Sequence, residues 1–392
     1  MRIQRTDENY LSQVIAMVRQ AQGSSSRSPD LSEGNTKPVA STATHTAHVN
    51  RAVGVIDSLL RGVGQVMFQN NAITGLLFLV GIFINSYKYG LTALLGLVVA
   101  TLAAYLLGAD RSLIRNGLFG FNGVLTGIAL SVFLRWDWHV AAYIILGAIV
   151  STIVMMGLAK LLISWDMAPL TGPFVLTAWL LLFALYHFGQ LHPTKLIDPM
   201  PVHPDVAIPT DLREAVGGGA AVGLTAANLA NAVFRGVGEV FLQDNLWTGV
   251  VFVVAILVNS RVCSGFALLG SALGGLTALV LGGDGVTIYH GLYGFNAVLT
   301  GIALGGRPDG LACPRGFLGL NWCSTIYASV GAIFSAIVFA AIAVALSPIG
   351  MPALTAPFVL TTWVFLLPTS GFRALQRVSV AEVRIPESTR AE

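Results

Sequence analysis

Two polar side chains occupy matching positions in segments that are otherwise mostly apolar. Gln65 directly follows the letters LRGVG, and Glu239 directly follows the letters FRGVG. A carboxyl group surrounded by hydrocarbon is costly, so such a residue is a functional candidate by default. The two side chains offer hydrogen-bond acceptors to a polar solute. The alternative for Glu239 is an ion pair with Arg235, four residues earlier on the same helix.

Aromatic and aliphatic side chains recur at a fixed spacing in a second pair of segments, which read FNGVL and FNAVL. Phe121 precedes Leu125 by four residues, and Phe295 precedes Leu299 in the same way. Residues four apart share one face of a helix. Two facing copies of this face would form a narrow slot with aromatic and aliphatic walls.

Hydroxyl and amide side chains accompany these walls. Thr171 and Thr355 lie in the segments LTGPF and LTAPF, two residues before a proline that suits the first turn of a helix. Each threonine either caps that helix or lines a passage with its hydroxyl group. Asn122 and Asn296, inside FNGVL and FNAVL, either line the same passage or turn toward backbone carbonyls and are structural.

All these pairs belong to one long internal repeat. Segments 60–71, 84–87, 108–110 and 117–130 recur 174 residues later, and segment 169–179 recurs 184 residues later. The extra residues enter between Leu304 and Ala353. Stretch 305–316, which contains two prolines and charged residues, predicts a loop at this place.

The composition indicates an integral membrane protein. The chain has 392 residues, of which 55% are hydrophobic and 10% charged, with a mean hydropathy of +0.74. A soluble domain carries about 25% charged residues. The net charge of +3 gives no sign of a nucleic-acid partner, and the three cysteines lack metal-ligand or disulfide spacing, so we expect no metal and no cofactor.

Each half predicts a short amphipathic leader followed by five apolar helices, with no β-barrel alternation. The leaders, 51–69 and 225–243, suit re-entrant helices, because irregular backbone at membrane depth must be covered by protein or line a cavity. The predicted spanning helices are 72–88, 89–108, 117–134, 139–163 and 172–189 in the first half, and 246–260, 264–283, 291–306, 321–347 and 356–370 in the second.

Five crossings end on the opposite side of the membrane from where they begin, so the second half is predicted to be inverted relative to the first. Both ends of the chain are basic, and the positive-inside rule places both in the cytoplasm. The fold class predicted is therefore an all-α membrane protein with two inverted repeats around a central pore. The predicted divisions are a polar tail (1–48), a first repeat (49–190), a linker (191–222), a second repeat (223–371) and a C-terminal tail (372–392).

These duplicated motifs resemble the urea transporter family over both halves of the chain, from about Arg61 to Trp363. The resemblance implies passive, channel-like transport of urea, a homotrimer with one pore per subunit, a location in the cell (inner) membrane, and ten spanning helices plus two re-entrant ones.

The resemblance also implies roles for individual residues. Gln65 and Glu239 are similar to the side chains at the two ladders of oxygens that accept urea N–H groups, and Thr171 and Thr355 to hydroxyl groups near the middle. Phe121 and Phe295 are similar to the rings that sandwich urea, and Leu125 and Leu299 to the central constriction. Two further lining positions are Phe68 and Val240. Leu242, the counterpart of Phe68, is not aromatic, so the two mouths need not be equivalent.

Urea suits such a passage because it is small, flat, neutral and rich in N–H donors. Each buried donor without an acceptor costs about 1–3 kcal/mol, so a dry pore must supply acceptors along its edges. Flat apolar walls then select for planarity.

Three other functions are the alternatives to urea transport, and each predicts its own set of residues. An ammonium or ammonia channel is expected to bring histidines together in its pore, but His139, His187 and His290 do not recur between the repeats. An ion-coupled transporter of a small amide could use Glu239 as a proton or sodium site. A membrane enzyme would need a nucleophile with a base, or a metal cluster, and the sequence offers no such grouping.

Overall fold

The computed structural model of the protein describes residues 40–185, 187–194, 225–307 and 316–377. The predicted tail up to residue 39, most of the predicted linker and the last residues of the C-terminal tail lie outside these ranges. The chain divides into two units, Met1–Asn50 and Arg51–Glu392, and both repeats lie in the second. Helix α2 (Ala40–Gln65) begins well before residue 51, where the sequence predicted the first leader.

The first repeat contains the five predicted apolar helices and one short helix that the sequence did not predict. After α2 come α3 (Ala72–Asn85), α4 (Tyr87–Leu106), the short α5 (Arg111–Arg115), α6 (Gly120–Phe133), α7 (Trp138–Leu162) with the 3-10 turn η1 (Ile163–Trp165), and α8 (Gly172–Leu185).

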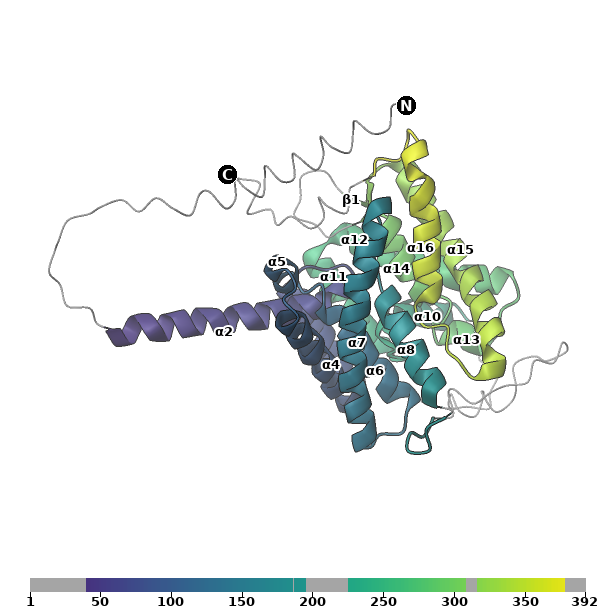
Figure 1. Ribbon diagram of the computed structural model, residues 1–392. Coiled ribbons are helices and arrows are strands. Elements are labelled where there is room, and N and C mark those ends of the chain that lie inside the picture. Colours follow the sequence, from purple (N-terminus) through teal and green to yellow (C-terminus); the bar gives the residue numbers. More distant parts are fainter. Residues whose placement is uncertain (1–39, 186, 195–224, 308–315, 378–392) are drawn as a thin grey trace, which may run out of the picture. The chain divides into compact units, whose positions relative to one another are not determined.

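The second repeat has the same order of elements. It contains α10 (Ala226–Gly238) with η3 (Glu239–Phe241), α11 (Leu246–Asn259), α12 (Arg261–Val280), α13 (Gly285–Tyr289), α14 (Phe295–Leu304), α15 (Trp322–Leu346) with η4 (Ser347–Ile349), and α16 (Ala356–Leu366) with η5 (Leu367–Gly371). Figure 1 shows the long helices α7 and α15 beside the shorter α8 and α16, and α8 also contacts α16.

Matching side chains start the matching helices. Asn71 and Asn245 cap α3 and α11, each accepting a hydrogen bond from the backbone N–H three residues later. Asp110 and Asp284 cap the short helices α5 and α13. Because a side-chain oxygen at this position satisfies N–H groups that the helix leaves open, the recurring GAD and GGD letters were an available signal for α5 and α13.

The apolar helices differ in whether they are long enough to cross a membrane. Among the described residues, four helices are long and apolar enough to cross a membrane alone: Tyr87–Leu106, Trp138–Trp165, Arg261–Val280 and Trp322–Ile349. The leader Ala226–Phe241 and α11 form a fifth candidate, bent by 77° at the break between them. The other apolar helices of the described residues have 10–17 residues, and all of them except Ala356–Gly371 are shorter than the sequence suggested. At about 1.5 Å per residue such helices reach only part of the way through a hydrocarbon core of about 30 Å.

The loop predicted at 305–316 contains an element that the sequence did not predict. Strand β1 (Gly306–Arg307) pairs in parallel with β2 (Leu318–Gly319), while residues 308–315 lie outside the described ranges. This two-residue pairing joins the chain on either side of the insertion.

Close helix packing in both repeats depends on glycines. A β-carbon added to Gly123 of α6 would collide with the backbone carbonyl of Gly96 on α4. Such contacts let two helix backbones approach each other closely, so this glycine serves helix packing.

Helices α8 and α16 begin inside the protein, where their first N–H groups have no water to bond. In α16, Ala356 N donates to Ala353 O (3.2 Å), and the second residue, Pro357, has no N–H. The N–H group of the third residue, Phe358, donates to Asn296 Oδ1 at 3.1 Å. The first repeat repeats this arrangement, with Phe174 N donating to Asn122 Oδ1 at 3.2 Å. The two asparagines therefore cap helices other than their own. They have a structural role, but through backbone N–H groups, and only Asn296 also donates to a backbone carbonyl, that of Leu354.

Hydrogen bonds between the repeats occur in reciprocal pairs. Thr74 Oγ1 donates to Ala255 O, while its counterpart Thr248 Oγ1 donates to Gly81 O, both at 2.9 Å. Similar pairs join Asn85 to Gln243 and Asn259 to Gln69, and join Trp179 to the carbonyl of Pro352 and Trp363 to that of Ala168. Contacts of this isologous kind are what an approximate twofold axis produces.

We expect Asn296→Ala to reduce the free energy of unfolding by about 1–3 kcal/mol, because it leaves the buried Phe358 N–H without an acceptor. Thermal unfolding of purified protein in detergent measures the loss. The control is Thr300→Val on the same helix, since the Thr300 hydroxyl only donates to Asn296 O, four residues earlier. Equal melting temperatures for the Asn296 variant and the unmodified protein would contradict the capping role.

Candidate functional site

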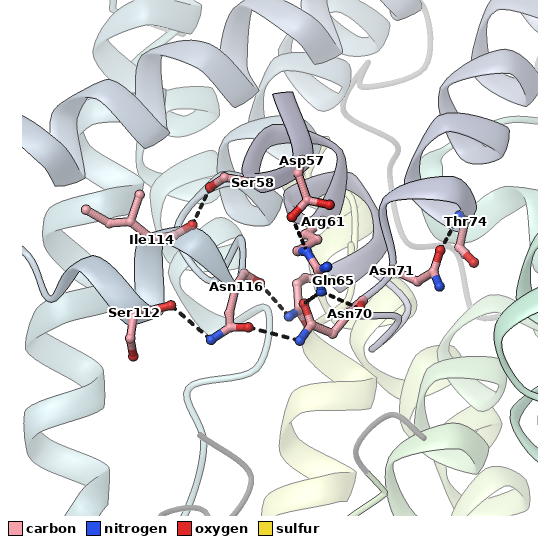
Figure 2. A network of polar contacts seen from close by, with 10 residues as sticks. All are labelled: Asp57, Ser58, Arg61, Gln65, Asn70, Asn71, Thr74, Ser112, Ile114 and Asn116. Atoms are coloured by element: carbon pink, nitrogen blue, oxygen red, sulfur yellow. Dashed lines mark hydrogen bonds and ion pairs between the residues drawn. The ribbon is translucent and has the colours of Figure 1, made fainter. Parts of the chain in front are cut away.

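Gln65 lies at the end of α2 within a network of neutral amides. Figure 2 shows its side chain directed toward the backbone of Asn116, and Gln65 Nε2 donates to Asn116 O at 2.7 Å. The Asn116 side chain accepts from Asn70 Nδ2 at 3.0 Å and donates to Ser112 O at 2.9 Å. The network fixes the amide of Gln65, which is 7% exposed, and its Nε2 group is already occupied. The remaining polar atom, Oε1, is an acceptor by chemistry.

The arginine of the first leader takes part in the same network. Arg61 Nε donates to Asp57 Oδ2 at 2.6 Å, and Arg61 Nη1 donates to Asn70 O at 3.0 Å and to Asn70 Oδ1 at 3.3 Å (Figure 2). The charge of Arg61 is thus paired with a carboxylate one helical turn earlier. The groups that bond Gln65 and Asn116 directly in this network are neutral.

In the second repeat, the same three positions carry ionisable groups in place of amides. Glu239 replaces Gln65, Asp244 replaces Asn70, and His290 replaces Asn116. Glu239 begins η3 and is 9% exposed. His290 Nδ1 lies 2.5 Å from Asp244 Oδ2, so these two side chains form a bonded pair.

Arg235 does not pair with Glu239, contrary to the alternative considered from the sequence. Its Nη1 group forms an ion pair with Asp244, and its guanidinium group lies 4.5 Å from the centre of the Tyr289 ring. Within the described ranges, the Glu239 carboxyl group forms neither an ion pair nor a hydrogen bond through its side chain. Glu239 is therefore buried but remains available to another hydrogen-bonding partner.

Each leader ends in a sharp turn at the residue three positions after the polar side chain. Phe68 and Leu242 have φ angles of 62° and 55°, a left-handed conformation that large side chains seldom adopt. The ring of Phe68 makes edge contacts with Phe358 and Phe317, at centroid distances of 6.0 and 6.2 Å. Phe68 thus connects the first leader to the first turn of α16, while Val240 is buried within η3.

Thr171 and Thr355 meet each other rather than capping their own helices. Their Oγ1 atoms are 2.7 Å apart, and both residues are 3% exposed. The two atoms occupy equivalent positions in the repeats, so a bond between them lies on the axis that relates the repeats. The Thr355 side chain forms no capping bond to α16. The N-cap alternative is wrong for Thr355, since Asn296 serves that N–H instead.

The predicted slot residues lie on the two helices that pack against α8 and α16. Phe121 and Leu125 lie on α6, which contacts α8, and Phe295 and Leu299 lie on α14, which contacts α16. The phenylalanines are 6% and 7% exposed, whereas both leucines are fully buried. Each Phe–Leu face therefore flanks a helix whose first turn carries one of the paired threonines.

Several residues around the site were not predicted from the sequence. Asn116, Tyr289 and His290 take part through contacts between elements that are distant in the chain. The repeat alignment placed Asn116 opposite His290, but spacing alone did not show that either residue adjoins a leader.

Comparison with known proteins agrees with the duplicated motifs. Residues 56–370 match the family described as "Urea transporter". The protein named "Urea transporter 1" of Ovis aries is 32% identical over 343 residues, covering 87% of this chain and 84% of the relative. The protein of the same name from Mus musculus is 32% identical over 338 residues, covering 86% and 82%. Because the match extends over both repeats and both leaders, this chain belongs to the urea transporter family.

Proposed function

We propose that the chain carries urea passively across a membrane through a pore centred on Thr171 and Thr355. The observation that carries this proposal is the hydrogen bond between these two threonines, because it brings the two repeats together at a buried polar point. Hydroxyl groups there can exchange their mutual hydrogen bond for bonds to a solute. A neutral amide needs such acceptors when it loses its water.

Gln65 and Glu239 are proposed as the acceptors at the two ends of this passage. Gln65 Oε1 and the Glu239 carboxyl oxygens are buried acceptors that lie in matching leaders. Phe68 and Val240 line the passage beside them. The charge of Arg61 near Gln65 is paired with Asp57, which supports a neutral solute, since an ion would need compensating charge to lose its hydration.

The four slot residues are proposed to select for shape. Phe121 and Phe295 would stack on the faces of a planar solute, and Leu125 and Leu299 would close the narrowest part. Their placement on α6 and α14, beside the helices that carry the threonines, supports this assignment. Weak, repeated contacts along the path allow the solute to leave as well as enter.

We also propose that the two repeats have opposite orientations in the membrane, with both ends of the chain in the cytoplasm. The reciprocal bonds between the repeats and the basic ends support this orientation. The family resemblance supports a homotrimer with one pore per subunit in the cell membrane.

Stopped-flow measurements on proteoliposomes test the function directly. Urea permeability is expected to follow the urea gradient and to be unchanged by proton or sodium gradients. A larger amide and ammonium serve as comparison solutes and are expected to pass more slowly. Urea flux that requires an ion gradient would contradict the passive mechanism.

Thr171→Val is expected to reduce urea permeability by roughly three- to tenfold, since one neutral hydrogen bond contributes about 0.5–1.5 kcal/mol. Thr355→Val is expected to have a similar effect, because the two hydroxyl groups are bonded to each other. Thr126→Val is the control, as the buried Thr126 hydroxyl donates only to a carbonyl of its own helix. Unchanged flux through the Thr171 variant would leave that hydroxyl with a purely structural role.

Leu125→Ala combined with Leu299→Ala is expected to widen the passage and increase permeability to a bulkier amide relative to urea. The ratio of the two permeabilities, measured in the same vesicles, is the readout. A ratio equal to that of the unmodified protein would show that these leucines do not form the constriction. Ala129→Gly, a small change at a buried position of α6, is the control for general loosening of the helix.

A further inference from the structure

In the second leader, Arg235 pairs with Asp244 rather than with Glu239, and the proposed function does not explain this choice of partner. Arg235 lies one helical turn before Glu239, close enough for a direct ion pair on the same helix. Arg235 and Asp244 both lie within electrostatic range of Glu239. Even so, Arg235 pairs with Asp244, which is located beyond the turn that ends the leader.

The groups that surround Arg235 come from three places in the chain. Asp244, in the segment between η3 and α11, pairs with Arg235 Nη1. From the end of α13, His290 Nδ1 lies 3.4 Å from Arg235 Nη1, and Tyr289 Oη accepts from Arg235 Nη2 at 3.4 Å. His290 in turn bonds to the second carboxylate oxygen of Asp244, so it fixes the orientation of that carboxylate.

The first repeat supplies its leader arginine with a carboxylate at a different place. Arg61 also donates to Asn70, the counterpart of Asp244, but its carboxylate partner is Asp57 on its own helix, and the position equivalent to Asp57 in the second repeat is Asn231. Arg235 Nε is buried without a hydrogen-bond partner among the described residues. Without an acid one turn earlier, Arg235 depends on Asp244 as its carboxylate partner.

We infer that Asp244 and His290 are positioning residues that hold Arg235 away from Glu239, so that the Glu239 carboxyl group stays open to the permeating solute. This inference rests on the proposed function of Glu239 as an acceptor. If Asp244 loses its charge, Glu239 becomes the carboxylate within reach of Arg235. The resulting ion pair would occupy the acceptor and place a guanidinium group beside the passage.

Urea permeability of proteoliposomes, measured by stopped flow, separates this role from a structural one. Asp244→Asn is expected to lower the permeability by about tenfold, which corresponds to about 1.4 kcal/mol. Adding Arg235→Gln to Asp244→Asn is expected to restore it to within about twofold of the unmodified protein, a margin below 0.5 kcal/mol. A structural role predicts the opposite, since the double variant loses more contacts than the single one.

Asp57→Asn provides the matched control in the first repeat. It also removes the carboxylate partner of a leader arginine, but the residue one turn after Arg61 is Gln65, which carries no charge. Urea permeability is expected to stay unchanged. A tenfold loss in this control would overturn the inference, because it would show that any unpaired leader arginine slows transport.

A second experiment places a carboxylate at the position of Gln65 in the first repeat. Its result does not depend on the folding of the Asp244 variant. Gln65→Glu combined with Asp57→Asn is expected to be slower than Gln65→Glu alone, because Arg61 then keeps only the neutral Asn70 as a partner and the new carboxylate is the charge left to pair with it. Equal flux in those two variants, or no recovery in the Asp244→Asn, Arg235→Gln protein, would overturn the inference. Absence of urea flux through the unmodified protein would overturn the proposed function itself, and the inference with it.

Discussion

The structure depends on satisfying the N–H groups of two helices that begin inside the protein. A helix leaves its first N–H groups unpaired, and at membrane depth there is no water to bond them. In α8 and α16 one of these groups is removed by proline, and another is bonded by an asparagine from a neighbouring helix. With the N–H groups served by Asn122 and Asn296, the threonine hydroxyl groups are released to face each other.

The approximate twofold relation between the repeats explains which duplicated residues must stay the same. On the axis, Thr171 meets its own counterpart, so both repeats need a group that can donate and accept. Away from the axis, each residue has its own surroundings, so the repeats are able to differ. Phe68 corresponds to Leu242, and the amides near Gln65 correspond to ionisable groups near Glu239. The bond on the axis pairs a residue with its own counterpart, while the two leaders have diverged at these positions.

The sequence predicted the repeat, the order of the apolar helices and the leaders, because periodic hydrophobicity and duplicated letters are local signals. It left open whether Thr171 was a cap or a lining group and whether Asn122 was structural or lining, because that choice depends on which side chain reaches the helix from elsewhere. The short helices α5 and α13 were missed, although Asp110 and Asp284 precede them as caps. The network of Asp244 with His290 joins residues 46 positions apart, and no local pattern indicates such a contact.

Charge at the mouths is arranged to be compatible with a neutral solute. Each leader carries an arginine, and each arginine is paired with a carboxylate other than the proposed acceptor. The first repeat places that carboxylate on the same helix, and the second places it after the turn, where His290 also holds it. Both solutions neutralise the cation locally and keep the acceptor unpaired. The two leaders thus meet one physical requirement with different residues, since Arg61 pairs with Asp57 and Arg235 pairs with Asp244.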